Sequence, residues 1–254
     1  MLRGLHLAAT GMLVQQLRQE VISNNLANLN TGGYKEDVTA LRSFPEVLME
    51  RLEGQAARMP IGITHYGVAL DEVVTRFDPG PLVETGHPTH LALVDSRGGP
   101  AAFFAVQVGE EVRYTRNGEF HVNDQGFLVT AEGYPVLGQG GPLQVGQGEF
   151  QVDAAGTIWR DGEELDRLQI VSFADQRRLI KTGANLFAAP PEAGAQEAGG
   201  VRIRQGWVEK ANVNLVREMT DMLAAMRAYE ASQKMIQAQD EALGKAVNEV
   251  GSLR

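Results

Sequence analysis

The sequence contains no cysteine among its 254 residues. Disulfide bonds, thiol chemistry and cysteine-ligated zinc are therefore excluded, although this absence does not decide the compartment. Basic residues are also in the minority, because 23 Lys and Arg stand against 32 Asp and Glu, for a net charge of −9. Only Arg177 and Arg178 are adjacent. A nucleic-acid-binding protein normally carries a basic patch, so we expect no nucleic-acid partner.

The sequence also lacks a long apolar run. A membrane-spanning helix needs roughly 18 such residues, so no integral membrane segment is expected. Residues 1–14 faintly resemble a secretory signal, with Arg3 ahead of a mildly apolar stretch. His6, Thr10 and Gly11 interrupt that stretch, and it runs into polar residues without a cleavage site. We therefore expect no cleaved signal peptide.

Motifs for catalysis and for cofactors are missing as well. The glycine-rich stretch 138–148 fits neither the dinucleotide fingerprint nor the phosphate-binding loop, and no Gly-x-Ser-x-Gly motif occurs. His87 and His90 have a spacing that can ligate a metal, but no third ligand accompanies them and the intervening proline favours a loop. Glu163 and Glu164 lie beside a turn signal, which favours solvated carboxylates. We expect no catalytic residue, no cofactor and no metal, and hence no enzyme.

The first zone of the chain predicts a helix. Hydrophobic residues make up 43% of the sequence, enough for a buried core. From 2 to 29 the apolar residues recur at helical spacing, and the stripe consists of Leu2, Leu5, Ala9, Leu13, Leu17 and Val21. An asparagine-rich segment follows, with Asn24, Asn25, Asn28 and Asn30 ahead of Gly32 and Gly33. Asn and Gly tolerate left-handed backbone conformations, so the helix is expected to end here in capping and turn geometry.

The last zone has the cleanest periodicity of the chain. Apolar residues from 219 to 250 are spaced alternately by three and four, and this heptad pattern predicts a long helix with a packing seam. The seam comprises Met219, Met222, Met226, Tyr229, Gln233, Ile236, Asp240, Leu243, Val247 and Val250. Gln233 and Asp240 either set the register of the pairing or face solvent. Asn214 is a plausible N-cap. Such a helix needs a partner, and the N-terminal stripe is the nearest candidate.

The middle zone, 60–207, predicts an all-β domain. Gly and Pro concentrate here, and short apolar runs alternate with turn signals. Residues 114–116 and 119–122 read as a hairpin closed by Asn117 and Gly118. The stretch 190–200 is rich in Ala, Gly and Glu and is expected to be a mobile loop. The fold class is therefore α+β, with a discontinuous terminal helical coiled-coil module (1–35 and 208–254), a connector (36–59) and an inserted β-rich outer domain (60–207).

Several motifs, in this order along the chain, resemble a known family. The N-terminal ones are 9–12 (ATGM) and 22–35 (ISNNLANLNTGGYK). The middle ones are 91–93 (LAL), 114–120 (YTRNGEF) and 129–135 (VTAEGYP). The C-terminal ones are 208–214 (VEKANVN), 218–219 (EM), 227–230 (RAYE) and 233–234 (QK). Together they closely resemble the bacterial flagellar rod and hook proteins of the hook–basal body family, over most of the chain.

The resemblance implies a structural role. Such subunits are exported unfolded through the flagellar type III apparatus without signal cleavage, and they assemble beyond the inner membrane into a helical tube that transmits torque. Their partners are copies of themselves and other rod and hook subunits. Their terminal helices form an inner layer and the β domain an outer one. A heterologous interface whose rotation does not close produces an open helical filament, which agrees with this outline.

Periodicity and resemblance together predict the assembly interface on the two terminal segments. The expected residues are Leu5, Ala9, Met12, Leu13, Leu17, Val21, Asn24, Asn25, Asn28, Asn212, Asn214, Met219, Met222, Met226, Tyr229, Ile236, Leu243 and Val247.

Alternatives remain open at this point. The chain has the tetrad 87–90 (HPTH) where many relatives carry one like Asn-Pro-Leu-Asp, and 44–75 offers no assignable motif. A proximal and a distal rod position are therefore both compatible with the sequence. The chain could instead be a cap-like or chaperone-like protein that binds the axial structure without polymerising. A third reading is an enzyme that opens peptidoglycan, for which the sequence offers no motif.

Overall fold

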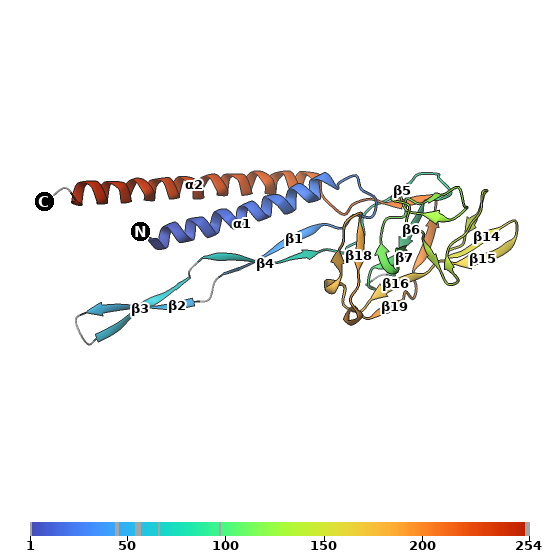
Figure 1. Cartoon of the computed structure of the whole chain (residues 1–254), viewed down its shortest axis with the longest axis horizontal. Helices are drawn as coiled ribbons and strands as arrows, with labels where there is room; N and C mark the ends of the chain where they lie inside the picture. The colour runs from blue at the N-terminus through green and yellow to red at the C-terminus, as the bar shows by residue number, and fades with distance from the viewer. Residues whose placement is uncertain (1, 44–45, 54–56, 66, 97, 252–254) are drawn as a thin grey trace. The chain divides into compact units, whose positions relative to one another are not determined.

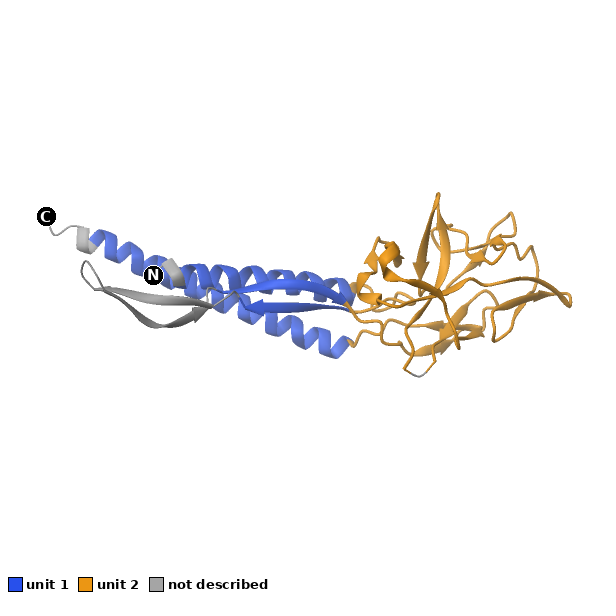
Figure 2. Cartoon of the chain, turned by 90° about the horizontal axis from the view of Figure 1, so that it is seen from below, with its two compact units in different colours: residues 1–26, 37–74, 215–254 blue, residues 27–36, 75–214 orange. Residues whose placement is uncertain are grey.

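The computed structural model describes residues 2–43, 46–53, 57–65, 67–96 and 98–251. A helix lies near each end of the chain with strands between them (Figure 1), which confirms the α+β class. The chain divides into two compact units. Unit 1 comprises 1–26, 37–74 and 215–254, and unit 2 comprises 27–36 and 75–214 (Figure 2). These boundaries differ from the expected ones, because 37–74 groups with the helices and 27–36 and 208–214 group with the β-rich unit.

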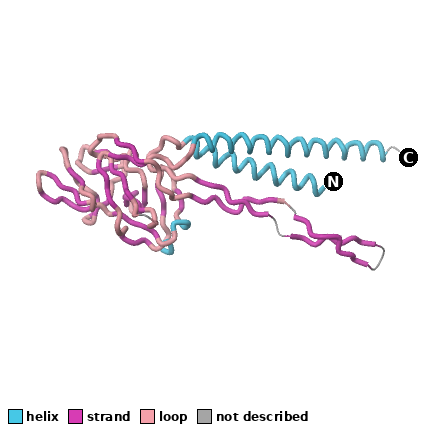
Figure 3. Tube along the Cα trace, turned by 180° about the vertical axis from the view of Figure 1, so that it is seen from behind, coloured by secondary structure: helices cyan, strands magenta, loops and turns pink. Residues whose placement is uncertain are grey.

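Unit 1 contains the two long helices, as the two periodic stretches predicted. They are α1 (Leu2–Ala27) and α2 (Leu215–Gly251). The helices run antiparallel and side by side, as Figures 1 and 3 both show. Among the residues that the structure describes, neither helix is long and apolar enough to cross a membrane.

Unit 1 also contains two strand pairs, and three of their four strands lie within 44–75, for which the sequence offered no motif. β1 (Asp37–Ser43) pairs with β4 (Val68–Thr75). β2 (Glu46–Glu53) pairs antiparallel with β3 (Ala57–His65), with a register shift after Met49. Most of the expected connector 36–59 is therefore β-strand.

The centre of unit 2 is a six-stranded sheet. Its strands in spatial order are β17 (Ile180–Lys181), β18 (Leu186–Ala188), β8 (Glu111–Thr115), β7 (Ala102–Val108), β16 (Ile170–Phe173) and β19 (Ala195–Glu197). Successive side chains of a strand point to opposite faces. Accordingly, Phe103 packs with Phe173 and Phe187 on one side of β7, whereas Phe104 packs with Phe120 and Leu143 on the other. The sheet is thus buried on both faces.

Shorter sheets complete unit 2. The pairs are β5 (Leu82–Glu84) with β21 (Trp207–Glu209), β6 (Leu91–Val94) with β20 (Arg202–Gln205), β9 (His121–Val122) with β10 (Leu128–Val129), and β11 (Leu137–Gly138) with β12 (Gly141–Pro142). β13 (Gln151–Val152), β14 (Thr157–Arg160) and β15 (Glu163–Arg167) form a three-stranded sheet. Two 3-10 turns are η1 (Gln176–Arg178) and η2 (Pro191–Ala193).

Two expectations about the β-rich part were wrong. The predicted hairpin at Asn117 and Gly118 does not form, because β8 pairs with β7 and β18 while β9 pairs with β10. A two-residue turn of type I′ needs positive φ at both positions, and neither residue has it. Instead the Asn117 side chain accepts a hydrogen bond from the Glu119 amide at 3.0 Å. The stretch 190–200 is also more than a loop, since it contains η2 and β19.

Candidate assembly interface

The helix pair of unit 1 keeps one register along its length. Three residues of α1 lie opposite three residues of α2 at matching intervals. A Cβ built on Gly4 would lie 2.2 Å from Nε2 of Gln239, and one on Gly11 would lie 3.5 Å from Oγ of Ser232. These two contacts are seven positions apart on both helices. Asn25, fourteen positions after Gly11, donates to Glu218, fourteen positions before Ser232, at 3.2 Å. Small residues at this spacing let the helices approach closely.

The seam between the helices is unusually polar. Arg18 and Asp221 form an ion pair at 3.2 Å, and Asn25 is only 1% exposed. Asn25 also accepts from the Asp37 amide and donates to the Asp37 carbonyl, so it links α1 to β1. Polar groups on a helix seam fix its register at a cost in stability. The pairing of α1 with α2 is therefore specific rather than strong.

Only some of the residues predicted to pack between the two helices are shielded from solvent within one chain. The buried apolar residues of the two helices are Ala8, Val14, Ile22 and Ala225, none of which was predicted. Half-buried predicted residues are Leu5, Met12, Leu17, Val21, Asn28, Asn212, Met222, Tyr229, Ile236 and Leu243. Exposed predicted residues are Ala9, Leu13, Asn24, Asn214, Met219, Met226 and Val247. The prediction weighted large apolar side chains, whereas the structure packs small ones at the closest approach.

An apolar ridge remains on the exposed side of α2. Met219, Leu223 and Met226 are 52%, 56% and 49% exposed. Their spacing of four and three places them on one helix face. We call these three residues the outer ridge. α1 likewise exposes Leu13. Exposed apolar side chains gathered on one helix face make this face a candidate for contact with another protein chain.

A second feature of functional interest is a buried group of charges in unit 2, which we call the junction cluster. It comprises Lys35, Asp95, Arg116 and Glu209. Lys35 Nζ lies 2.8 Å from Glu209 Oε1, and Arg116 Nε donates to Glu209 Oε2. The other end of Arg116 holds both oxygens of Asp95, at 2.9 and 2.7 Å. Side chains of Lys35, Arg116 and Glu209 are at most 2% exposed.

The charges of the junction cluster depend on one another. Burial alone raises the pKa of a carboxyl group, but Arg116 and Lys35 outweigh burial and lower the pKa of Glu209. Burial also lowers the pKa of Lys35, by more than Glu209 raises it. Burial opposes the charge of Arg116, yet Glu209 and Asp95 hold its pKa above the usual value. Two cations and two carboxylates thus balance, and each needs the others.

The junction cluster joins segments from both ends of the chain inside unit 2. The Gly33 amide donates to the Glu209 carbonyl at 2.7 Å, and the Glu36 amide donates to Asn212 Oδ1 at 2.7 Å. Gly33 has a φ of 65°, and a Cβ there would lie 2.4 Å from the Arg116 carbonyl carbon. Asn212 was expected at the assembly interface, but its amide bonds backbone within unit 2.

Sequence reasoning missed the junction cluster, although three of its residues, Lys35, Arg116 and Glu209, lie in the quoted motifs. The available signal was the presence of these charged residues in short motifs that consist mostly of apolar, amide-bearing and glycine residues. Charged residues are almost never fully buried unless they are paired.

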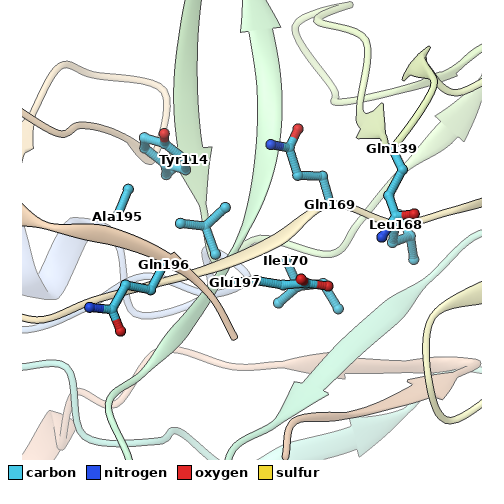
Figure 4. Close-up of a pocket in the computed structure, with 9 residues that line it drawn as sticks. Tyr114, Gln139, Leu168, Gln169, Ile170, Ala195, Gln196 and Glu197 are labelled. Carbon is cyan, nitrogen blue, oxygen red and sulfur yellow. The ribbon is translucent and has the colours of Figure 1, made fainter. Parts of the chain in front are cut away.

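Two further features of unit 2 are a pair of histidines and a groove. The rings of His87 and His90 are 4.9 Å apart, and the His90 Nδ1 bonds the Thr85 hydroxyl at 2.9 Å. Burial, followed by the charge of His87, lowers the pKa of His90. Within the described ranges, no group of three His, Asp or Glu is arranged to hold a metal ion. A groove of about 380 Å³ in unit 2 is lined by apolar residues, by three glutamines that include Gln139 and Gln169, and by Tyr114 and Glu197 (Figure 4).

Comparison with known proteins identifies the family. Three family models match along the chain. They are "Flagella basal body rod protein" at residues 5–35, "Flagellar hook protein FlgE/F/G D1 domain" at 100–160, and "Flagellar basal body rod FlgEFG protein C-terminal" at 204–249. The first and third contain parts of α1 and α2, and the first and second contain Lys35 and Arg116.

Curated relatives match over nearly the whole chain. The flagellar hook-basal body complex protein FlhO of Bacillus subtilis is 34% identical, and all of both chains is covered. The flagellar basal-body rod protein FlgG of Agrobacterium fabrum is 33% identical over 94% of this chain and 96% of its own. FlgF of Salmonella typhimurium is 31% identical over 94% of each chain. This chain belongs to the flagellar hook–basal body rod protein family.

Proposed function

We propose that this chain is a structural subunit of the flagellar basal-body rod, which polymerises through α1 and α2 into a helical tube and so transmits torque. The observation that carries the proposal is the outer ridge on a helix pair whose seam is polar. The names of the relatives, flagellar basal-body rod proteins, support it. The expected partners are further copies of this chain and other rod and hook subunits.

The energetics favour a second copy as the occupant of the outer ridge. Fully burying one Met or Leu side chain contributes about 1.5–3 kcal/mol, so three such residues are a substantial surface for a neighbour. The contact between α1 and α2 within one chain is stabilised less, since the amide oxygens of Gln15 and Gln239 are buried without a donor among the described residues. An apolar face at three and four spacing matches a partner helix. α1 offers one through Leu13 and its neighbours.

A contact between the outer ridge of one copy and α1 of another joins two different surfaces. Such heterologous contacts repeat from copy to copy, and they generate a helical filament when the rotation does not close. In this proposal the helical module forms the inner part of the tube and the β-rich unit 2 the outer part. We further propose that the chain reaches the basal body unfolded through the flagellar export apparatus, without signal cleavage.

We propose no catalytic activity for this chain. The relatives are named as rod and hook–basal body proteins rather than as enzymes. The groove that contains Gln139 and Gln169 is lined mostly by amide and apolar residues, and Glu197 is the only carboxylate in its lining, so it does not bring together the acid and base groups of a hydrolase site.

A single charge on the outer ridge tests the proposal. Met226→Glu should abolish rod assembly and motility, because the carboxylate would have to be desolvated between helices. Unit 2 should stay folded, since Met226 lies in unit 1. The measurements are swimming in soft agar, immunoblots of isolated basal bodies, and circular dichroism of the purified chain.

Ala231→Glu is the matched control, because Ala231 is exposed on α2 but lies off the outer ridge. It should assemble and support swimming. Normal motility with Met226→Glu protein present in isolated basal bodies would rule out the outer ridge as an assembly surface. Failure of both variants to assemble would place the contact elsewhere on α2. A cap-like or chaperone-like protein, in contrast, would bind basal bodies in substoichiometric amounts.

A further inference from the structure

Strands from the beginning of unit 2 pair with strands near its C-terminal end. β5 (82–84) pairs with β21 (207–209), and β6 (91–94) pairs with β20 (202–205). Lys35 bonds Glu209 across 174 positions of the chain, and Arg116 bonds it across 93. Contacts of such separation form only after the loop between them has closed.

Glu209 is the group that balances the junction cluster. Without it, Lys35 and Arg116 would be two buried cations facing the single carboxylate of Asp95. Their other acceptors are the neutral carbonyls of Asp78, Ala102 and Leu93. Removing one partner of a buried ion pair is strongly destabilising, because it leaves a charge without compensation. A closed unit 2 is therefore costly until Glu209 has entered it.

Glu209 also supplies more than its charge. Its Oε1 accepts from the Gly80 amide at 2.7 Å, and its carbonyl accepts from the Gly33 amide. Three separate stretches of chain, around residues 33–36, 78–80 and 93–116, thus converge on this one residue. No earlier residue of β20 or β21 could satisfy them all.

We propose that unit 2 closes in one concerted step that requires residues 207–212, with Glu209 as the closing residue. Until this segment arrives, the six-stranded sheet stays open even though all of its strands precede it in the chain. Folding of unit 2 is therefore delayed until Glu209, a residue near its end, is in place. The proposal does not depend on polymerisation.

Pulse-labelled hydrogen exchange during refolding of the full chain tests this proposal. Amides of β7, β8 and β16 should become protected at the same rate as those of β5, β6, β20 and β21. Glu209→Gln should slow protection of all these strands at least tenfold. The matched control is Glu84→Gln, an exposed carboxylate on the strand that pairs with β21, and it should change the rates by less than twofold.

A double variant tests the proposal even if Glu209→Gln fails to fold. Lys35→Met combined with Glu209→Gln removes one buried cation together with the carboxylate, and Arg116 keeps its two bonds to Asp95. This double variant should recover most of the lost rate. Protection of β7 and β8 in an earlier phase than β20 and β21 would overturn the proposal. So would slowing confined to β5 and β21, or a double variant no faster than the single one.

Discussion

At the scale of single residues, Glu209 links three separate parts of unit 2. It binds an ammonium, a guanidinium and a backbone amide with one carboxylate. Charge-assisted hydrogen bonds of this kind are shorter and stronger than neutral ones. The junction cluster is thus a stability device whose strength depends on the protonation of its carboxylates.

The lowered pKa of Glu209 predicts how stability changes with pH. A carboxylate with a depressed folded-state pKa contributes stability above its unfolded value, about 4.5, and this stability is lost as pH falls through the lower folded value. Glu209→Gln should therefore lower the free energy of unfolding at pH 7 by about 3–5 kcal/mol. Below pH 4.5 the difference between variant and wild type should shrink.

Urea unfolding followed by tryptophan fluorescence, from pH 3 to pH 7, measures this dependence. Trp207 reports on the region, since it lies two positions from Glu209 in β21. A stability difference that stays constant over the whole range would show that the carboxylate charge is not what Glu209 contributes.

Single residues were also the hardest level to predict from the sequence. The Asn-rich and Gly-rich motif 22–35 predicted a helix end and a turn, and it does form one. The burial of Lys35 could not be foreseen, because its partners lie far away in the chain and only the fold brings them together. Periodicity identifies faces, whereas a buried ion pair leaves no periodic signal.

At the scale of elements, both helices were predictable, because each has a long apolar period. The faces by which they pair were not. Gly4, Gly11, Ala225 and Ser232 occupy the seam because their side chains are small. Pattern recognition favours the largest apolar residues, and these lie partly on the exposed side. The hairpin at Asn117 failed for a related reason, since side-chain hydrogen bonds replaced the expected turn.

Replacing Gly11 and Gly33 by alanine should change the stability of the protein in opposite directions. Gly11 lies inside α1, and a Cβ there would make ordinary contact with Ser232 at 3.5 Å. Gly11→Ala should raise the stability of α1 by up to about 1 kcal/mol, because Gly is a poor helix former. Gly33→Ala should lower the stability of unit 2 by more than about 1 kcal/mol, because φ is positive and the Cβ would strike the Arg116 backbone.

Amide hydrogen exchange of the native chain resolves the two effects by location. Exchange should slow in α1 for Gly11→Ala and accelerate in β5 and β21 for Gly33→Ala. Equal effects of the two substitutions would contradict the assigned roles of these glycines.

At the scale of the whole molecule, the two segments that make up unit 2 determine which residues should resist proteolysis together. The sequence predicted a β-rich domain of 60–207. The structure instead builds unit 2 from 75–214 together with the distant segment 27–36. That segment is held by Lys35 and also by Tyr34, whose ring lies 4.4 Å from Lys181 Nζ.

Limited digestion with thermolysin should therefore leave two pieces that stay together without a covalent link. After cleavage between residues 37 and 74, the segment 27–36 should stay bound to the segment 75–214. A peptide that contains Lys35 should therefore co-elute with the 75–214 core on native size exclusion. Mass spectrometry of the eluted peak identifies both pieces. Loss of the Lys35 peptide from the native core would show that this segment is only loosely attached.

The constant register of α1 and α2 bears on how proteins of this family can change in length. One extra residue in a helix turns every later side chain by about 100°, which would bring large residues to positions where Gly4 and Gly11 now allow close contact. An insertion in one helix is tolerated only as a full heptad, or with a matching change in the other. The turn at Asp161 and Gly162 in unit 2 has no such register to keep, since both residues are exposed and already have positive φ. Changes in chain length are therefore expected in turns of this kind rather than within the paired helices.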